Sequence, residues 1–203
     1  MKKLSIENPF FEFMGKIGDI MIINLLFLLC SVPVVTIGAS VSAMYKVFGE
    51  MGEETYISPF KSFKNAFIPS LKKSTPVWLL SLITGLVLVF DLMFVTKAQA
   101  SIFWHITGMV TGCLMFLWLL VMCWLFPAAL FKEGTLKDMV KRSMFLAVRN
   151  FPYTFLMVLL DLIPVICFIL GDYYAALVAP VYFIIGFGIT ALINRKIMDK
   201  CVV

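Results

Sequence analysis

Long apolar stretches almost free of charge dominate the pattern of hydrophobic and polar positions along the chain. Three of them contain no Asp, Glu, Lys or Arg, and two others contain a single acid each. A helix of about 20 apolar residues crosses the hydrocarbon core of a bilayer. Trimmed to plausible helix ends, the pattern predicts five transmembrane helices, at residues 20–45, 77–96, 104–127, 153–171 and 174–194.

The composition agrees with this prediction. Hydrophobic residues make up 62% of the 203 positions and charged residues only 14%, whereas a soluble domain has about 25% charged residues. So few charges cannot cover a water-soluble surface, and neither disorder nor nucleic-acid binding fits. The apolar runs do not alternate as β-barrel strands do. We therefore predict an all-α polytopic membrane helix bundle, one integral membrane domain over residues 1–203, whose partner is the lipid bilayer and not nucleic acid.

Basic residues indicate how the helices are oriented. Thirteen of the 17 Lys and Arg residues lie in the 46–76 connection, the 128–152 connection and the C-terminus. Positive charge gathers on the cytoplasmic side, so we expect a multi-pass protein of the cell membrane with its C-terminus in the cytoplasm and its N-terminus outside. The alternative is a first stretch that bends at Pro33 and re-enters, leaving the N-terminus inside. The 26 residues of 20–45 are too few to cross twice at 1.5 Å per residue.

Two basic amphipathic helices are predicted in the long connections, at about residues 58–73 and 135–150. Each has an apolar stripe at helical spacing opposite a basic face. Such a helix either lies among anionic lipid headgroups or packs its stripe on the bundle. The candidate headgroup contacts are Lys61, Lys64, Lys72, Lys141, Arg142 and Arg149.

The two connections also align with each other without gaps. Residues 60–76 and 136–152 both have Lys in second place and Pro in last place, directly before a predicted span. We therefore formulate the hypothesis of a duplicated unit of span, amphipathic helix and span.

Polar side chains within the apolar stretches are the candidates for function, because ionisable groups are costly in hydrocarbon. Asp161 lies near the middle of its predicted span, Asp91 nearer the outer interface, and Asn24 in the first span. In a transport protein Asp161 would relay a proton or cation, with Asn24 or Thr84 completing a polar lining. In a structural role Asp161 would be neutral, or hydrogen-bonded to a helix opened by Pro164.

Other chemistry is weakly represented in the sequence. The single histidine and five scattered cysteines have no metal-ligand spacing, no phosphate-binding glycine motif occurs, and no nucleophile–base pair is visible. We therefore predict no catalytic residue, no metal and no cofactor. Small residues at 38–43 and the pair Gly108 and Gly112 suit close helix packing, within the protein or with a partner.

The sequence NLLFLLCSVPVVTIG at residues 24–38, followed by AMY at 43–45, resembles the signature of the YesL family of bacterial integral membrane proteins. FKSFK at 60–64, Asp91, the Phe126–Pro127 pair and NFP at 150–152 fit the resemblance, whereas Ala39 stands where the family often has proline. The resemblance implies an uncharacterised family, often encoded beside carbohydrate uptake and polysaccharide-degradation systems. It implies no catalytic or binding residues.

From these observations we expect a non-enzymatic accessory or regulatory protein associated with carbohydrate uptake, with importer subunits or a second copy of the chain as partners. The alternative is a small transporter or channel that uses Asp161.

Overall fold

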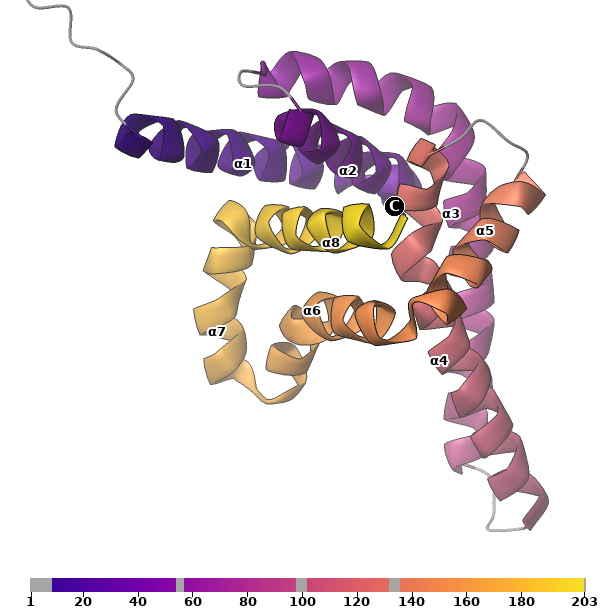
Figure 1. Ribbon diagram of the computed structural model, residues 1–203. Coiled ribbons are helices and arrows are strands. Elements are labelled where there is room, and N and C mark those ends of the chain that lie inside the picture. The colour runs from indigo at the N-terminus through magenta and orange to yellow at the C-terminus, as the bar shows by residue number, and fades with distance from the viewer. Residues whose placement is uncertain (1–8, 54–56, 98–101, 132–135, 203) are drawn as a thin grey trace, which may run out of the picture.

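The computed structural model describes residues 9–53, 57–97, 102–131 and 136–202, and this part of the chain is helical without strands (Figure 1). Five helical segments in it are long and apolar enough to cross a membrane, which confirms the predicted all-α fold class. The elements are α1 (Pro9–Ser31), η1 (Val34–Thr36), α2 (Ile37–Glu53), α3 (Pro59–Lys97), α4 (Ile102–Phe131), α5 (Leu136–Arg149), α6 (Phe151–Ile169), α7 (Asp172–Val181), η2 (Tyr182–Gly186) and α8 (Phe187–Val202).

The single span predicted over residues 20–45 is wrong. Helix α1 ends at Ser31, and the chain turns through Pro33, whose φ of −74° and ψ of 115° are extended. Proline also disfavours helical backbone at the residue before it. The Thr36 hydroxyl donates to the carbonyl oxygens of Cys30 (2.6 Å) and Pro33 (2.8 Å), and the Pro33 oxygen also accepts the Thr36 N–H (2.9 Å). The chain therefore bends at Pro33, as in the alternative weighed from the sequence, and α2 follows the bend. Re-entry of this stretch and the side on which the N-terminus lies stay predictions.

The amphipathic segment at 58–73 and the span at 77–96 are one continuous helix, α3, and not two helices. At 1.5 Å per residue its 39 residues are about 58 Å long, well beyond a hydrocarbon core of about 30 Å. Pro69 and Pro76 lie inside it, and Figure 1 shows α3 bending before it descends beside α4. By contrast, α5 and α6 are separate helices that meet at Asn150, with Pro152 in the first turn of α6. The two aligned connections therefore fold differently.

The last predicted span, 174–194, covers two helices, α7 and α8, that are joined at an angle. The π-helical turn η2 separates α7 from α8, and Figure 1 shows the chain changing direction there. Gly171, between α6 and α7, has a φ of +127°, which a residue with a Cβ rarely adopts. The predictions at 104–127 and 153–171 agree with α4 and α6, and α5 matches the second amphipathic helix from Leu136 onward.

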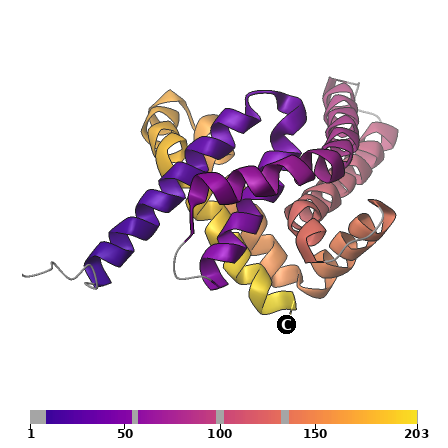
Figure 2. The ribbon, with the colours of Figure 1, turned by 90° about the horizontal axis from the view of Figure 1, so that it is seen from above.

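The helices pack as a body with a projecting hairpin. In Figure 1, α1, α8 and α6 lie one below another, while the C-terminal half of α3 and α4 extend away from them as a pair, which recedes from the viewer in Figure 2. Helix α2 packs closely on α3: Gly38 faces the Trp78 side chain, and the hydroxyls of Ser42 and Ser74 are 2.8 Å apart. The small residues at 38–43 thus pack within the protein.

Candidate functional site

Asp161 borders a cavity between the helices. The cavity measures about 460 Å³ and is lined by side chains from α1, α2, α3, α4, α6, η2 and α8. Asp161 lies on α6 and is exposed, because the cavity is partly open to the outside. The sequence identified the residue, but six other elements supply its surroundings.

The Asp161 carboxylate belongs to a small polar cluster. The Asn194 side-chain amide on α8 donates to Asp161 Oδ1 at 2.9 Å, and the Cys123 thiol on α4 donates to Oδ2 at 3.6 Å. The same Asn194 amide lies 3.4 Å from the Tyr45 hydroxyl of α2. We define Asp161, Asn194, Tyr45 and Cys123 as the acid cluster.

Asn194 is the most constrained member of the acid cluster. It is completely buried, and its Oδ1 has no hydrogen-bond partner within the described part of the chain. A buried acceptor without a partner costs about 1–3 kcal/mol. The hydrogen bonds from its nitrogen to Asp161 and Tyr45 offset part of this cost.

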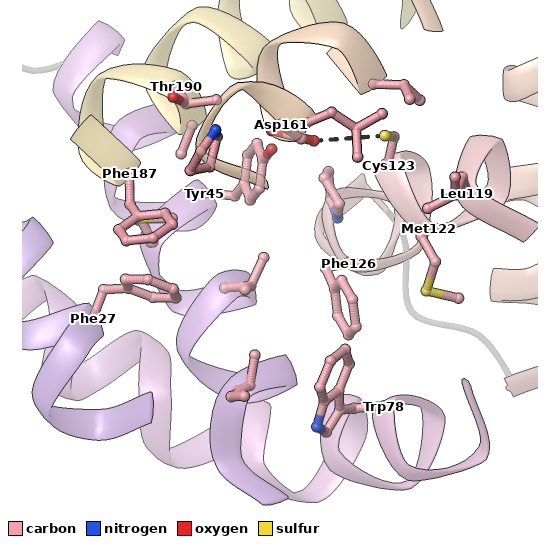
Figure 3. A pocket seen from close by; sticks show the side chains of 18 of the residues that line it. Phe27, Tyr45, Trp78, Leu119, Met122, Cys123, Phe126, Asp161, Phe187 and Thr190 are labelled. Atoms are coloured by element: carbon pink, nitrogen blue, oxygen red, sulfur yellow. Dashed lines mark hydrogen bonds between the residues drawn. The ribbon is translucent and has the colours of Figure 1, made fainter. Parts of the chain in front are cut away.

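Aromatic rings form much of the remaining cavity wall. Trp78 and Phe126 pair with their centroids 5.9 Å apart, and Phe27 and Phe187 pair at 5.6 Å. Figure 3 shows Asp161, Cys123, Tyr45 and Thr190 gathered at one end of the cavity, with the two aromatic pairs below them. The site thus has a polar end with one carboxylate and an apolar, aromatic body.

A second, smaller cavity of about 210 Å³ adjoins the first. Pro164, Tyr182 and Phe187 line both cavities, and the rings of Tyr182 and Phe187 pack edge to face with centroids 5.1 Å apart. These three side chains therefore form the wall between the two spaces. The other residues that line the smaller cavity are apolar.

Asn24 does not line the Asp161 cavity, contrary to the role weighed for it in transport. It is completely buried and binds backbone at the corner between α7 and α8. Its Nδ2 donates to the carbonyl oxygens of Phe183 (2.8 Å) and Tyr182 (3.3 Å), and its Oδ1 accepts from the Gly188 N–H (2.8 Å). A π-helical turn shifts the regular hydrogen-bond ladder, and Asn24 satisfies backbone groups at this shift.

Asp91 lies apart from the acid cluster, in the hairpin of α3 and α4. It is exposed and accepts a short hydrogen bond from the Thr111 hydroxyl of α4. Thr84, the other residue weighed as cavity lining, bonds back to the Leu80 carbonyl of its own helix at 2.9 Å. Neither residue lines the Asp161 cavity.

The candidate headgroup residues lie on the surfaces of α3 and α5. Five of them are exposed and Arg142 is half-buried. Their contact with lipid stays a prediction. Within the described ranges, no three His, Cys, Asp or Glu residues come together in a group that could hold a metal ion, and the five cysteines are free thiols.

Sequence reasoning missed Asn194, Tyr45 and Cys123 as partners of Asp161. Asn194 closes the last uncharged stretch and Cys123 resembles the other scattered cysteines, so no local signal marked them. Their sequence separations from Asp161 are 33 and 38 residues for Asn194 and Cys123. Only the packing of four helices brings the cluster together.

Comparison with known proteins gives one match. Residues 20–92 match the model of a family described as "Protein of unknown function, DUF624". No curated protein and no solved structure matches the chain. The matched segment includes Asn24 and Asp91 but ends before Asp161. Over this segment, the chain is similar to a family of proteins without an assigned function.

Proposed function

We propose that this protein is a non-enzymatic multi-pass membrane protein that binds a small solute in the Asp161 cavity, as the binding site of a small transporter or channel. The observation that carries the proposal is a carboxylate at the edge of a cavity of about 460 Å³ among apolar helices. Pockets of about 300–1,000 Å³ are typical of small-molecule sites. An acid retained among apolar helices marks a solute or ion path by default.

The chemistry of the cavity argues against a free sugar as the solute. A sugar carries many hydroxyl groups, and each one that loses water without finding a partner costs about 1–3 kcal/mol. The polar groups that line the cavity are few, chiefly Asp161, Tyr45, Thr190 and Cys123, and most of the lining is apolar. A solute with a largely apolar body suits this wall better.

A cavity-filling variant tests the proposal. Ala191 on α8 lines the cavity and is 3% exposed, so Ala191→Phe places a ring in the solute space. Ala176→Phe is the matched control, because Ala176 is exposed on α7. The measurement is the thermal unfolding midpoint in lipid nanodiscs with a panel of small cationic, neutral and anionic aromatic solutes and glucose.

We expect at least one aromatic solute to raise the midpoint of the unmodified chain and of Ala176→Phe, but not of Ala191→Phe. A ligand at about 100 times its Kd adds about 2.7 kcal/mol of stability. Midpoints without solute show whether each variant folds. If no solute raises the midpoint, or if Ala191→Phe keeps the full effect, the cavity is not a solute site.

An accessory role in carbohydrate uptake is the second proposal. It is supported by the resemblance of residues 24–45 to a family encoded beside such systems, and by exposed basic residues on α3 and α5 that offer a docking surface. In this role importer subunits contact the protein and no sugar enters the cavity. Co-purification in mild detergent with importer subunits, together with reduced sugar uptake on deletion, is the expected result. Recovery of the protein alone with unchanged uptake contradicts it.

A further inference from the structure

Within the described residues, no positively charged side chain is among the hydrogen-bond partners of the Asp161 carboxylate. Its hydrogen-bond partners in the described part of the chain are the Asn194 amide and the Cys123 thiol, which are both neutral. An ionised acid among apolar helices is costly unless a positive charge accompanies it. A ligand that brings one positive charge to the polar end of the cavity therefore gains more there than a neutral or anionic ligand.

The rest of the cavity indicates what kind of cation fits. Ca²⁺ needs about 6–8 oxygen ligands, and the lining side chains offer far fewer. The Trp78–Phe126 and Phe27–Phe187 pairs instead present ring faces and edges, which pack on apolar groups and attract organic cations. We propose that the Asp161 cavity binds a monovalent organic cation with an apolar body. This inference rests on the solute-binding function proposed above and adds the class of solute.

Cys123 provides a native reporter at this position. Its thiol touches Asp161 and lines the cavity. A methanethiosulfonate reagent reacts with the thiolate, which attacks the sulfenyl sulfur, forms a mixed disulfide and releases methanesulfinate. The modification rate of Cys123 thus measures how readily a reagent of given charge reaches Asp161. Cys167, half-buried on α6 and lining neither cavity, is the internal control.

The experiment uses the complete chain in lipid nanodiscs, open to solvent on both faces. Initial modification rates at Cys123 and Cys167 are measured by peptide mass spectrometry with trimethylammonioethyl, sulfonatoethyl and methyl methanethiosulfonate. Each rate is divided by that of a free thiol in solution. We expect the cationic reagent to exceed the anionic one at Cys123 by roughly tenfold, from one unit charge a few ångströms away. The formal net charge of +5 acts in the opposite direction.

Asp161→Asn should reduce this preference to about one, because it removes the negative charge. Asparagine keeps the shape of the side chain and can still accept the hydrogen bond from Asn194. Asp161→Glu should keep the preference, and so should Asp91→Asn, which changes an acid outside the cavity. Size-exclusion elution shows which variants fold. A preference that survives in Asp161→Asn overturns the inference.

A pair of probes of equal shape separates a cation from an apolar occupant such as a lipid chain. Phenyltrimethylammonium and tert-butylbenzene differ in one charge. We expect the first to slow the reaction of Cys123 with methyl methanethiosulfonate at least tenfold more effectively than the second, and to have no such effect in Asp161→Asn. If both probes protect Cys123 equally, the site is apolar, and the inference that the cavity binds a cation is overturned.

The two proposals fail in different ways. If the neutral reagent modifies Cys167 but no reagent modifies Cys123, solutes do not reach the cavity and the solute-binding function itself fails. If all three reagents modify Cys123 at equal normalised rates, the cavity admits solutes and only the inference of a cation fails.

Discussion

Asp161 and Asp91 are both single acids within long apolar stretches, and they have different surroundings. Asp161 contacts side chains from two other helices at the edge of a cavity, whereas Asp91 pairs with one threonine across a two-helix hairpin. The two acids differ in how deeply their surroundings are buried. Asn194, which donates to Asp161, is completely buried in the body, whereas many apolar residues of the hairpin around Asp91 are exposed. An intramembrane acid is therefore informative about function only when its neighbours are known.

The largest expected effect follows from Asn24, which holds the corner of the body. Asn24→Ala removes three hydrogen bonds to backbone groups of Tyr182, Phe183 and Gly188. Losing buried partners at about 1 kcal/mol each should lower the free energy of unfolding by about 3 kcal/mol. Denaturant unfolding in detergent measures it. Asn65→Ala, at an exposed position of α3, is the control and should change little.

Two glycines give the next contrast between body and hairpin. A Cβ on Gly38 would lie 2.5 Å from the Trp78 Cβ and 3.1 Å from the Ser74 carbonyl oxygen, whereas nothing lies within 4 Å of one on Gly112. Gly38→Ala should therefore cost about 1–3 kcal/mol by overpacking. Gly112→Ala should gain up to about 1 kcal/mol from helix propensity. If the two variants have equal unfolding midpoints, the body is not more tightly packed at Gly38 than the hairpin is at Gly112.

The smallest effects come from the donors to the two acids. Asn194→Ala removes a buried donor and should lower the free energy of unfolding by about 1.5 kcal/mol. Thr111→Val removes one interhelical hydrogen bond at an exposed acid and should lower it by about 0.6 kcal/mol, the typical value between membrane helices. The same unfolding assay measures both. A larger loss for Thr111→Val would reverse the comparison.

The sequence was informative wherever one helix decides the outcome. Length and apolarity predicted α4 and α6, and the amphipathic stripe predicted α5, because these properties depend on neighbours in the chain. Asp161 could be singled out as a candidate for the same reason, but its surroundings could not be predicted, because its partners lie on other helices. A bend at Pro33 was weighed only as the alternative to a single span over 20–45, and the extent of α2 beyond it was not predicted.

Tertiary packing decided the rest. The interior prolines Pro69 and Pro76 bend α3 without ending it, whereas Pro152 begins a new helix, so the same residue type has opposite effects. The role of Asn24 depends on a π-helical turn more than 150 residues away. No local sequence pattern predicts the contact between α1 and η2. The members of the acid cluster other than Asp161 were missed for the same reason.

The wall shared by the two cavities has a consequence for how large a guest the protein can hold. Pro164 is fixed in its helix, whereas the orientations of Tyr182 and Phe187 depend on side-chain torsions. Tyr182 begins the π-helical turn at which Asn24 binds backbone, and Phe187 follows that turn directly. Turning one ring aside would join the compartments into a single chamber reaching from α2 to α7. If a guest enters, the orientations of the Tyr182 and Phe187 rings would therefore decide how much space it finds.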